Sequence, residues 1–573
     1  MNFPDPEDSY VVPDDGALGD RVGQMFPALN AAQGKRLMSL GERQSWNDGD
    51  LLFEAGKIGA GLFVVLSGWV VITNRDARGD DRLVVEQGAG QFLAEVGQLS
   101  GKPALVDGRA RGVVETLLLD PGALRQLLIV DAAIGELVMR ALILRRVALI
   151  ESGSGGPILI GSAAMPDMVR LETFLSRNGM PNTVLDPDED EDARALIDRF
   201  GVSPDELPLA ICPNGEVLRN PTDRALSHCL GLDAIDTDTL HDVAIVGAGP
   251  AGLAAAVYAA SEGLSVVVLD AKSFGGQAGA SARIENYLGF PTGISGQALA
   301  GRAFSQAQKF GAQIAVPVSV ERLDCTRENP SLILADGRRI RARTVVVASG
   351  AAYRRPSVLG LQRYEGRGVS YWASPIEARL VKGEEVAMVG GGNSAGQAAV
   401  YLASHCNIVN LVVRRPLVET MSNYLIERIA ALPNVHLHVG AEISALEGNT
   451  AGLTGVTWRN RETGEEVSCA TRYLFLFIGA DPNSAWLGEC DAVRDRKGFV
   501  VTGDTIDADA LKGAGWHADR RPMPLETSIA GVFAIGDVRA GSVKRVAAGV
   551  GEGAAVVAQI HSYLAGIEVQ AAQ

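Results

Sequence analysis

Short runs of β-branched and aromatic residues, separated by glycine, characterise the first part of the chain. The segment WNDGDLLFEAGKIGAGLFVVLSGWVVITNRD (46–76) alternates such runs with glycine-containing turns, which predicts a small β-roll or barrel. From Pro121, the segment GALRQLLIVDAAIGELVMRALILRRVALI carries apolar residues at helical spacing, which predicts an unbroken helical stretch. The residues that follow, ESGSGGP (151–157), have the composition of a flexible linker.

Strand and helix patterns alternate between residues 158 and 232. Apolar strand patterns occur in ILIG, TVLD and LAIC, and helical patterns occur in MVRLETFLSRNG and EDARALIDRFGV. Such alternation predicts a small α/β unit with some parallel strand pairing. The polar stretch DAIDTDTLH (233–241) separates this unit from the rest of the chain.

Length and charge limit the classes of protein to consider. A chain of 573 residues is too long for one core and predicts three to four domains. Its 47% hydrophobic and 21% charged residues are typical of a soluble globular protein. The net charge of −16 argues against nucleic acid or an anionic membrane surface as a partner.

The amino terminus and the cysteines bear on the cellular location. The first 20 residues lack the basic and apolar regions of a signal peptide, and the longest apolar runs are too short to span a bilayer. The six cysteines are Cys212, Cys229, Cys325, Cys406, Cys469 and Cys490. Because no two of them form CxxC, we expect all six to be reduced, buried residues of a cytoplasmic protein, and we expect no metal site.

A glycine-rich turn between a strand and a helix opens the last part of the chain. The segment DVAIVGAGPAGLAAAVYAASEGLSVVVLD places Gly247, Gly249 and Gly252 in the GxGxxG pattern. These glycines permit a tight turn, close approach of a pyrophosphate and close helix packing, and the helix amino terminus attracts phosphate. Asp270 ends the second strand, where a carboxylate would accept hydrogen bonds from a ribose diol.

A second copy of this pattern differs in its charge. In EEVAMVGGGNSAGQAAVYLASHCNIVNLVVRR, the GxGxxA positions are Gly390, Gly392 and Ala395. The place of the acidic residue is taken by Arg414 and Arg415, whose guanidinium groups would pair with a 2′-phosphate. One site for a diol and one for a 2′-phosphate predict FAD together with NADPH. The alternative is that the two arginines are only a solvated strand end.

A third signal lies near the carboxyl terminus. In GVFAIGDVRAGSVKRVAAGVGEGAAVVAQIHSYL, a strand ends in Gly536-Asp537 before a helix. An aspartate at that junction can hold a ribitol hydroxyl while helix amides approach a flavin ring. By itself the pattern would indicate only an ordinary turn with an N-capping aspartate.

These three elements, in this order, resemble the thioredoxin reductase family of two-domain flavoproteins. The resemblance covers about residues 240–573, and its segments are GAGPAGLAAAVYAA, GGQAGASARIENYLGFP, VVVASGA, GGGNSAGQAAVYLA, FLFIGADPN and GVFAIGDV. It implies two Rossmann-like domains: an FAD-binding domain formed by residues 240–355 and 479–573, and an NADPH-binding domain inserted at 356–478. It also implies a homodimer.

The resemblance implies two sets of cofactor-binding residues. For FAD they are Gly247, Gly249, Pro250, Ala251, Gly252, Asp270, Gly276, Gln277, Asn286, Gly350, Gly536, Asp537, Arg545, Val546 and Ala547. For NADPH they are Gly390, Gly392, Asn393, Ser394, Ala395, Arg414 and Arg415.

The sequence departs from the family where electrons would leave the flavin. The family's redox-active CxxC falls within YWASP, so that Trp372 and Pro375 replace its two cysteines. We expect Trp372 to shield the flavin ring or to pack in the interdomain seam, and Pro375 to fill space. The basic cluster differs as well, because Val413 replaces a histidine and Glu419 replaces a third arginine.

The amino-terminal parts resemble two known modules that have lost their functional residues. Residues 1–150 resemble a cyclic-nucleotide-binding domain, in which Glu95 keeps the ribose-binding position. Ala104 and Leu105 replace the residues that contact the cyclic phosphate, so we expect weak or no binding of cyclic nucleotides. The whole arrangement resembles bacterial fusions of such a domain with a thioredoxin reductase-like flavoprotein.

Residues 158–232 resemble the thioredoxin or glutaredoxin fold. The active-site turn is Ser162-Ala163-Ala164-Met165, which has no nucleophile, and Pro208 matches the family's cis-proline. We therefore expect a structural role for this part of the chain.

The leading hypothesis is an NADPH-dependent FAD oxidoreductase that passes electrons directly to an unidentified external acceptor. Hydride transfer requires no side-chain acid or base, so no catalytic residue is assigned. A ferredoxin or flavodoxin–NADP reductase-like enzyme and a redox or nucleotide-state sensor with little turnover are the alternatives. A true thioredoxin reductase would need two remote cysteines, such as Cys325 and Cys406, to meet.

Overall fold

The computed structural model describes most of the chain and divides it into two compact units. The described residues are 10–11, 21–75, 80–94, 99, 101–152, 155–163, 165–325, 329–450, 452–516, 518 and 520–571. The first unit comprises Met1–Asp236, Ala259–Val267 and Phe304–Val318, and the second comprises Thr237–Tyr258, Val268–Ala303 and Ser319–Gln573. Within the described residues, no helix is long and apolar enough to cross a membrane.

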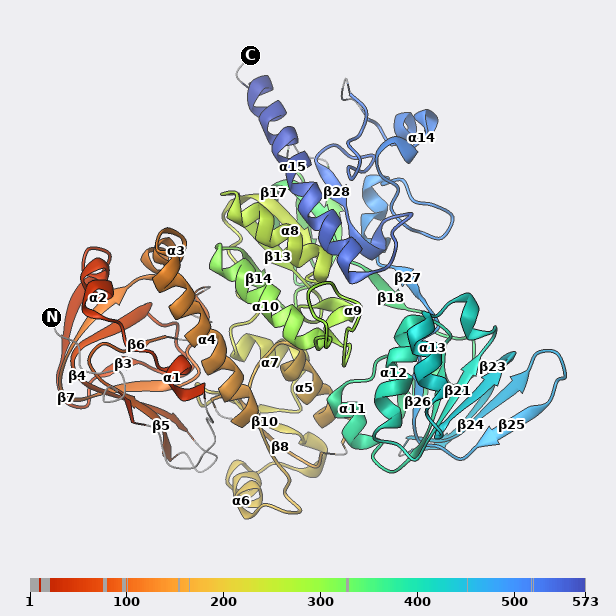
Figure 1. Cartoon of the computed structure of the whole chain (residues 1–573), viewed down its shortest axis with the longest axis horizontal. Helices are drawn as coiled ribbons and strands as arrows, with labels where there is room; N and C mark the ends of the chain where they lie inside the picture. Colours follow the sequence, from red (N-terminus) through yellow and green to blue (C-terminus); the bar gives the residue numbers. More distant parts are fainter. Residues whose placement is uncertain are drawn as a thin grey trace. The chain divides into compact units, whose positions relative to one another are not determined.

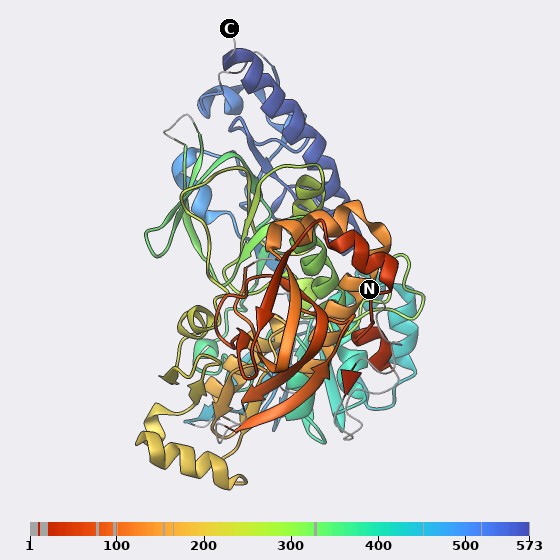
Figure 2. The same cartoon turned by 90° about the vertical axis from the view of Figure 1, so that its left-hand side faces the viewer.

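The first unit begins with a β-roll, as the glycine-punctuated strand pattern predicts (Figures 1 and 2). Its strands are β1 (Tyr10–Val11), β2 (Glu42–Trp46), β3 (Leu51–Phe53), β4 (Leu62–Arg75), β5 (Asp81–Gln87), β6 (Phe92–Leu93) and β7 (Asp107–Leu119). They pair in the order β1-β5-β4-β7-β2, with β3 beside β7 and β6 beside β4. The long strands β4 and β7 pair antiparallel, and their inward side chains form an apolar core that includes Phe63 and Val114.

The helices of the roll differ from the prediction at one point. They are α1 (Val22–Met25), α2 (Ala31–Leu37), α3 (Pro121–Val130) and α4 (Ala132–Ser152). The helical stretch predicted to be unbroken is interrupted at Asp131, which is extended (φ −109°, ψ 91°). Its carboxylate accepts a hydrogen bond from the Ile134 amide at 3.1 Å. Aspartate is favoured at the start of a helix and disfavoured in its interior, so Asp131 begins α4 instead of continuing α3.

A buried guanidinium joins α4 to the roll. Arg145 donates from Nε to the Met25 carbonyl at 2.8 Å and from Nη1 to the Phe92 carbonyl at 2.9 Å. Its guanidinium carbon lies 5.0 Å from the Phe26 ring centre and 4.8 Å from that of Phe92. Burial lowers the pKa of Arg145 to about 9. Hydrogen bonds and aromatic faces thus replace the water that this cation has lost.

The next part of the first unit is the predicted small α/β arrangement. Its strands are β8 (Ile158–Ile160), β9 (Thr183–Leu185), β10 (Leu209–Ile211) and β11 (Val217–Arg219). Its helices are α5 (Pro166–Arg177), α6 (Glu191–Phe200), the 3₁₀ turn η4 (Pro204–Glu206) and α7 (Asp223–Cys229). The strands pair in the order β11-β10-β8-β9, with β8 and β9 parallel. The Leu207–Pro208 bond is cis, as the resemblance implies.

Two residues near Ala104, the predicted phosphate position of the roll, contact this α/β part. Lys102 donates from Nζ to the carbonyls of Gly231 and Leu232 at 2.9 and 3.0 Å, and burial lowers its pKa to about 8. Leu105 belongs to the same apolar cluster as Leu159 and Leu226. The segment from Lys102 to Leu105 therefore acts as an internal contact surface.

Two dinucleotide-binding halves make up most of the remaining chain, which confirms the predicted strand–turn–helix order. The first half has the sheet order β14-β13-β12-β17-β16-β15, with β28 beside β17. Its strands are β12 (Leu240–Val246), β13 (Val266–Leu269), β14 (Gln313–Ala315), β15 (Val320–Asp324), β16 (Ser331–Leu334), β17 (Arg339–Val347) and β28 (Val532–Ala534). Its helices are α8 (Pro250–Ser261), α9 (Gly276–Gly279), α10 (Gly296–Lys309), α14 (Ala508–Gly513) and α15 (Val546–Ala571). Short 3₁₀ segments include η7 (Ala485–Cys490), η8 (Gly503–Thr505) and η9 (Gly536–Val538).

The second half is inserted between the paired strands β18 (Ala351–Tyr353) and β27 (Ala480–Pro482). Its main strands are β19 (Val369–Ser370), β20 (Glu385–Val389), β21 (Ile408–Val413), β22 (Val435–Val439) and β26 (Leu474–Leu476), in the order β19-β26-β20-β21-β22. A smaller sheet contains β23 (Ala441–Asn449), β24 (Gly452–Asn460) and β25 (Glu466–Cys469). The helices are α11 (Pro375–Leu380), α12 (Asn393–Ala403) and α13 (Asn423–Ala430), with the 3₁₀ turns η5 (Leu361–Arg363) and η6 (Leu417–Glu419).

The helices α12 and α13 and the small sheet lie on the two sides of the main sheet of this half (Figure 1). Alternate residues of β20 pack against these two layers. Val386 and Met388 pack in the cluster with α12 and α13, whereas Ala387 and Val389 pack in the cluster with the small sheet. Because successive side chains of a strand point to opposite faces, a continuous apolar run here means burial on both faces.

The prediction that all six cysteines are reduced is wrong for four of them. Cys212, after β10, is bonded to Cys229 at the end of α7, and Cys325, after β15, is bonded to Cys490 at the end of η7. Cys406 and Cys469 are free and buried, as predicted. The pairs are 17 and 165 residues apart in sequence, and chain folding brings them together in a way that no local spacing reveals.

Replacing Arg145 with methionine should destabilise the roll. The change keeps the apolar stem but leaves buried carbonyls without their charged donor, and each such hydrogen bond contributes about 1.5–3 kcal/mol. We expect the free energy of opening of β4 and β7, measured by hydrogen exchange, to fall by about 3 kcal/mol. Arg140→Met is the control, because the ion pair that Arg140 makes among the described residues is with the exposed Glu136 on the same helix, and the expected change is below about 0.5 kcal/mol. Equal effects of the two substitutions would contradict this account.

Candidate cofactor-binding site

Three parallel strands of the first dinucleotide-binding half end side by side. Val246 of β12 pairs with Val347 of β17, which in turn pairs with Ala534 of β28. Each strand is followed at once by a glycine-containing turn, at residues 247–249, 348–350 and 535–537. In open α/β sheets, ligands bind at this carboxyl edge. Three of the segments predicted to contact FAD are thus brought together by the strand register.

The glycines of the first turn are required by their surroundings. Gly247 has φ +110°, and an added Cβ would lie 2.2 Å from the Ala348 carbonyl oxygen. A Cβ on Gly252 would lie 1.9 Å from the Gly247 carbonyl oxygen, so Gly252 permits the close packing of α8. Around Gly249, in contrast, the nearest atom to an added Cβ is the Gly276 Cα at 4.0 Å. The backbone is therefore open on this side of the helix amino terminus, where the sequence predicts that a pyrophosphate binds.

Asp270 has a structural role in addition to the predicted one. Its Oδ2 accepts from the Ala248 amide at 2.8 Å, and its Oδ1 accepts from the amides of Lys272 and Ser273 at 2.8 and 3.1 Å. The carboxylate holds the glycine turn against the end of β13. Oδ1 already accepts two bonds, but Oδ2 accepts only one of these three and so keeps a lone pair for a ribose diol.

The amino terminus of α15 packs against that of α8 at Ala251. Added Cβ atoms on Gly536 and Gly549 would lie 2.9 and 3.4 Å from the Ala251 Cβ, and one on Gly553 would lie 2.5 Å from the Ala251 carbonyl oxygen. The strand-end turn at Gly536 and the two helices therefore meet at Ala251.

A charged cluster surrounds Asp537. Glu552 accepts from the Gly536 amide at 2.6 Å and pairs with Arg539 at 2.5 Å. Lys544 donates from Nζ to the Asp537 carbonyl, lies 4.1 Å from the centre of the Phe499 ring and has a left-handed backbone (φ +59°). Burial raises the pKa of Asp537, although Lys544 opposes this shift.

Sequence reasoning missed Lys544, Arg539 and Glu552 and assigned the adjacent residues Arg545, Val546 and Ala547. No motif marks a left-handed lysine, and only the structure reveals it. Arg545 and Ala547 are exposed at the start of α15.

The remaining predicted flavin contacts lie near the same edge. Gln277, on the short helix α9, donates to the Ala351 carbonyl, one residue beyond Gly350. Gly276 has φ +54°, and an added Cβ would lie 3.0 Å from the Gly249 Cα, so α9 approaches the first glycine turn. Asn286 is exposed in the described loop between α9 and α10. Pro250 is the first residue of α8, a position that proline prefers.

The second glycine turn repeats the geometry of the first. Gly390 has φ +142°, and an added Cβ would lie 2.4 Å from the Phe477 carbonyl oxygen, whereas one on Gly392 would meet no atom within 4 Å. Asn393 and Ser394 form the first turn of α12, and Ala395 is fully buried beneath them. Asn393 accepts from the Ser422 amide at 2.8 Å and so holds the next loop in place.

Arg414 and Arg415 directly follow β21 beside this turn. Both side chains are exposed, and Arg415 makes a 3.8 Å ion pair with Glu419, itself 48% exposed. Arg414 forms no hydrogen bond or ion pair with any residue that the structure describes. Such a guanidinium, at the end of the second strand of the motif, fits a 2′-phosphate.

The segment predicted to correspond to the family's cysteine pair is a helix cap. Ser374 and Glu377 form a capping box at the amino terminus of α11, and Pro375 is the first helical residue. Glu377 is buried and accepts from the Ser374 amide at 3.0 Å and from the Trp372 indole at 2.9 Å. The expectation that Pro375 fills space is not met, because Pro375 is exposed, whereas Trp372 is half-buried 6.5 Å from the Tyr353 ring.

Both residues predicted to replace the phosphate contacts of the amino-terminal domain are buried. Ala104 is 1% exposed in the core of the roll, and Leu105 is buried against the α/β part. Glu95 lies outside the described residues, as does Ala164 of the Ser162–Met165 turn. A buried alanine in an apolar core offers no charge to a cyclic phosphate.

Comparisons with known proteins agree with this arrangement. The pyridine nucleotide-disulphide oxidoreductase family model matches residues 241–553, and the cyclic nucleotide-binding domain model matches residues 43–131. The chain is 31% identical over 327 residues to the thioredoxin reductase of Bacillus subtilis (strain 168), covering 57% of this chain and 96% of that protein. It is 32% identical over 333 residues to NADPH-dependent thioredoxin reductase 3 of Arabidopsis thaliana, but spans only 59% of that protein.

The fold is also similar to a solved structure. The crystal structure of T. acidophilum thioredoxin reductase aligns with a TM-score of 0.50 and 30% identity, covering 57% of this chain and 99% of that one. Since the family model matches more than half of the residues, the chain belongs to the pyridine nucleotide-disulphide oxidoreductase family, as a thioredoxin reductase-like flavoprotein joined to a cyclic nucleotide-binding domain.

Proposed function

We propose that the chain is an NADPH-dependent FAD oxidoreductase whose electrons pass directly to an external acceptor, without a disulfide beside the flavin. The observation that carries this proposal is the amino terminus of α11. Where the family has its cysteine pair, Trp372, Ser374 and Pro375 form a helix cap around Glu377. None of these groups can undergo thiol–disulfide exchange, so transfer through a disulfide at this point is excluded by its chemistry.

The residues around the two glycine turns would bind and orient the cofactors. The amino termini of α8 and α12 would receive the pyrophosphates of FAD and NADPH, and Asp270 would accept from a ribose. Bound FAD would supply the two-electron chemistry, with NADPH as the donor. The hydrogen bond from Lys544 to the Asp537 carbonyl would fix the turn at residues 535–537, which would face the flavin.

The bridge between Cys325 and Cys490 lies too far along the sheet to substitute for the missing pair. Cys325 follows Asp324, which pairs with Ser331, and Ser331 pairs with Arg341 of β17. The six residue-to-residue steps along the strand from Arg341 to Val347 correspond to about 20 Å. Cys325 therefore lies level with the opposite edge of the sheet from the glycine turns. It does not pair with Cys406, contrary to the arrangement considered for a relocated thioredoxin reductase centre.

A sensor with little turnover is a second candidate, and the internal contact of Lys102 favours it. Because Lys102 and Leu105 contact the α/β part, a conformational change in the β-roll would be transmitted to residues 158–232. Steady-state NADPH consumption with a panel of acceptors separates the two candidates, since a sensor would consume little with any of them. The acceptor, a homodimer and a cytoplasmic location stay predictions.

Substituting Arg414 tests the choice of nucleotide. A charged hydrogen bond contributes about 1.5–3 kcal/mol, so Arg414→Ala should weaken NADPH binding by roughly 10–100-fold and leave NADH nearly unchanged. Binding is measured by titration of flavin fluorescence in the FAD-loaded protein. Arg459→Ala, an exposed arginine on β24 of the same half, serves as the control and should alter neither nucleotide. Equal weakening of NADPH and NADH by Arg414→Ala would refute the assignment.

Anaerobic titration tests the absence of a neighbouring disulfide. With no thiol pair beside the flavin, the rapid phase of reduction should take up two electrons per FAD and show no thiolate-to-flavin charge-transfer band. Thioredoxin should not be reduced beyond a control without enzyme. A rapid four-electron endpoint would show that a disulfide communicates with the flavin, and direct transfer would then be wrong.

Calorimetry tests the amino-terminal domain. Since Ala104 supplies no charge and is buried in the core, cyclic AMP and cyclic GMP should give no binding heat with the full-length protein at micromolar concentrations. Micromolar affinity for either nucleotide would mean that another cation faces the phosphate and that Ala104 is wrongly aligned.

A further inference from the structure

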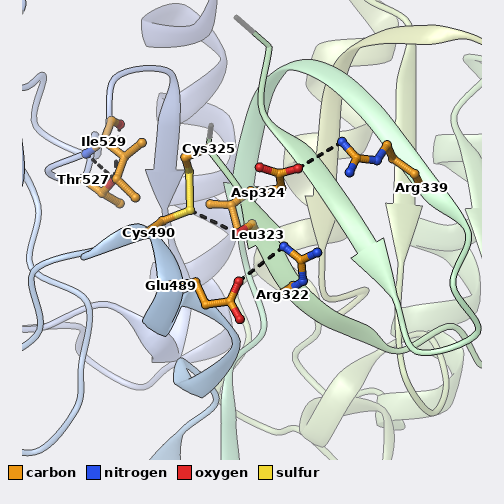
Figure 3. The surroundings of a disulfide bond; sticks show 9 residues. All are labelled: Arg322, Leu323, Asp324, Cys325, Arg339, Glu489, Cys490, Thr527 and Ile529. Carbon is orange, nitrogen blue, oxygen red and sulfur yellow. Dashed lines mark hydrogen bonds and ion pairs between the residues drawn. A yellow bond between two sulfur atoms is a disulfide. The ribbon is translucent and has the colours of Figure 1, made fainter. Parts of the chain in front are cut away.

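The Cys325–Cys490 bridge spans the inserted half of the chain. Cys325 directly follows β15, and Cys490 is the last residue of η7 (Figure 3). Their Cα atoms lie 6.0 Å apart, and 165 residues of sequence separate them. Both linker strands, β18 and β27, and everything between them lie inside the covalent loop. Bridges that close long loops restrict the chain most.

A second contact runs beside the bridge. Arg322 on β15 and Glu489 on η7 form an ion pair at 3.3 Å, and the Cys490 sulfur lies 3.1 Å from the Leu323 carbonyl oxygen (Figure 3). The ion pair is solvent-exposed, with the two side chains 39% and 67% exposed, so it contributes little once the covalent bond is gone. The disulfide is therefore a stronger constraint on this junction than the ion pair, beside the packing of the fully buried Leu487 in η7.

Accessibility distinguishes the two disulfides. Cys325 and Cys490 are both half-buried, whereas Cys212 and Cys229 are only 3% and 8% exposed in an apolar cluster. Burial also raises the pKa of the free thiols Cys406 and Cys469, to about 11 and about 12. Thiol attack requires access to a disulfide sulfur, so an external thiol should reach the Cys325–Cys490 pair first.

The segment that the bridge holds leads directly to the linker strands. Cys490 is eight residues beyond Pro482, the end of β27, and Pro482 pairs with Ala351 of β18. Asn483 donates its amide to the Gly350 carbonyl at 3.0 Å and its side chain to the Ser349 carbonyl at 3.1 Å. One short segment thus connects the bridge, the base of the insertion and a turn of the candidate flavin site.

We propose that Cys325–Cys490 is a thiol-exchange site whose reduction by an external dithiol releases residues 483–490 and loosens the paired strands β18 and β27. In the first step, one thiolate of the dithiol attacks one cysteine sulfur, a mixed disulfide forms, and the other cysteine leaves as a thiolate and takes up a proton. In the second step, the remaining thiol of the dithiol resolves the mixed disulfide. The dithiol becomes a disulfide, and two electrons and two protons reach the cysteine pair. This proposal does not depend on the identity of the flavin's acceptor.

The first measurement is of access. The full-length protein is treated under native conditions with graded dithiothreitol, alkylated, and analysed by peptide mass spectrometry. Cys325 and Cys490 should be alkylated at least about tenfold faster than Cys212 and Cys229, because only the former pair is open to attack without unfolding. Equal rates for all four cysteines would overturn the proposal.

The second measurement is of the consequence. Hydrogen exchange of residues 480–490 and of β18 should accelerate at least about tenfold in the dithiothreitol-treated protein, because closure of the loop no longer restrains them. Cys490→Ser should show the fast exchange without treatment and no further change with it, and Cys229→Ser, which breaks the buried pair, should leave these segments as in the untreated protein. Unchanged hydrogen exchange after loss of the bridge would refute the proposed role. The dithiothreitol-treated protein without substitutions gives this result even if a variant does not fold.

A third arm keeps this proposal apart from the proposed function. NADPH alone, added anaerobically to the FAD-loaded protein, should leave Cys325 and Cys490 unalkylated during rapid flavin reduction. Alkylation in that phase would show that the flavin itself reduces the bridge. It would overturn both the external dithiol as the reductant and the proposed direct transfer of electrons from the flavin to an acceptor. If instead the first two measurements contradict the proposal, direct electron transfer from the flavin is unaffected.

Discussion

Close approach of the backbone at the ends of parallel strands is the constraint on which the cofactor-binding half depends. Gly247 and Gly252 bring the start of α8 so near to β12 and β17 that a single added methyl group would overlap a carbonyl oxygen. The same crowding recurs at Gly536 and Gly553 around Ala251. The first turn is tightly packed at Gly247 and Gly252, whereas the space around Gly249 on its other side is open. The chemistry of the site begins with this asymmetry of packing.

Local patterns were sufficient to predict much of the fold. The two strand–turn–helix units were recognisable because the glycine requirement, the apolar strands and the helix start coincide in short stretches around Gly247 and Gly390. The break at Asp131 escaped prediction because the apolar spacing continues across it, and only the capping of α4 marks the interruption. Periodicity detects faces of helices better than their ends.

Contacts between distant residues were beyond local reasoning. Nothing near Cys325 in the sequence points to Cys490, and nothing near Lys102 points to Gly231. Lys544 was not assigned because no sequence motif marks it, whereas its left-handed backbone and its bond to Asp537 arise from the turn that surrounds it. The predicted carboxylate role of Asp270 was incomplete for the same reason, since three backbone amides converge on it.

The pairing of β18 with β27 has a consequence for the modularity of the chain. Ala351 faces Pro482 across this ladder, so the two points where the inserted half joins the other half are neighbours in space. A segment whose ends already touch can be removed and its flanks joined by a short turn, without stretching either side. The architecture thus permits one nucleotide-binding half to be exchanged for another, or lost altogether, while the three-strand edge that carries Gly247 and Gly536 keeps its register.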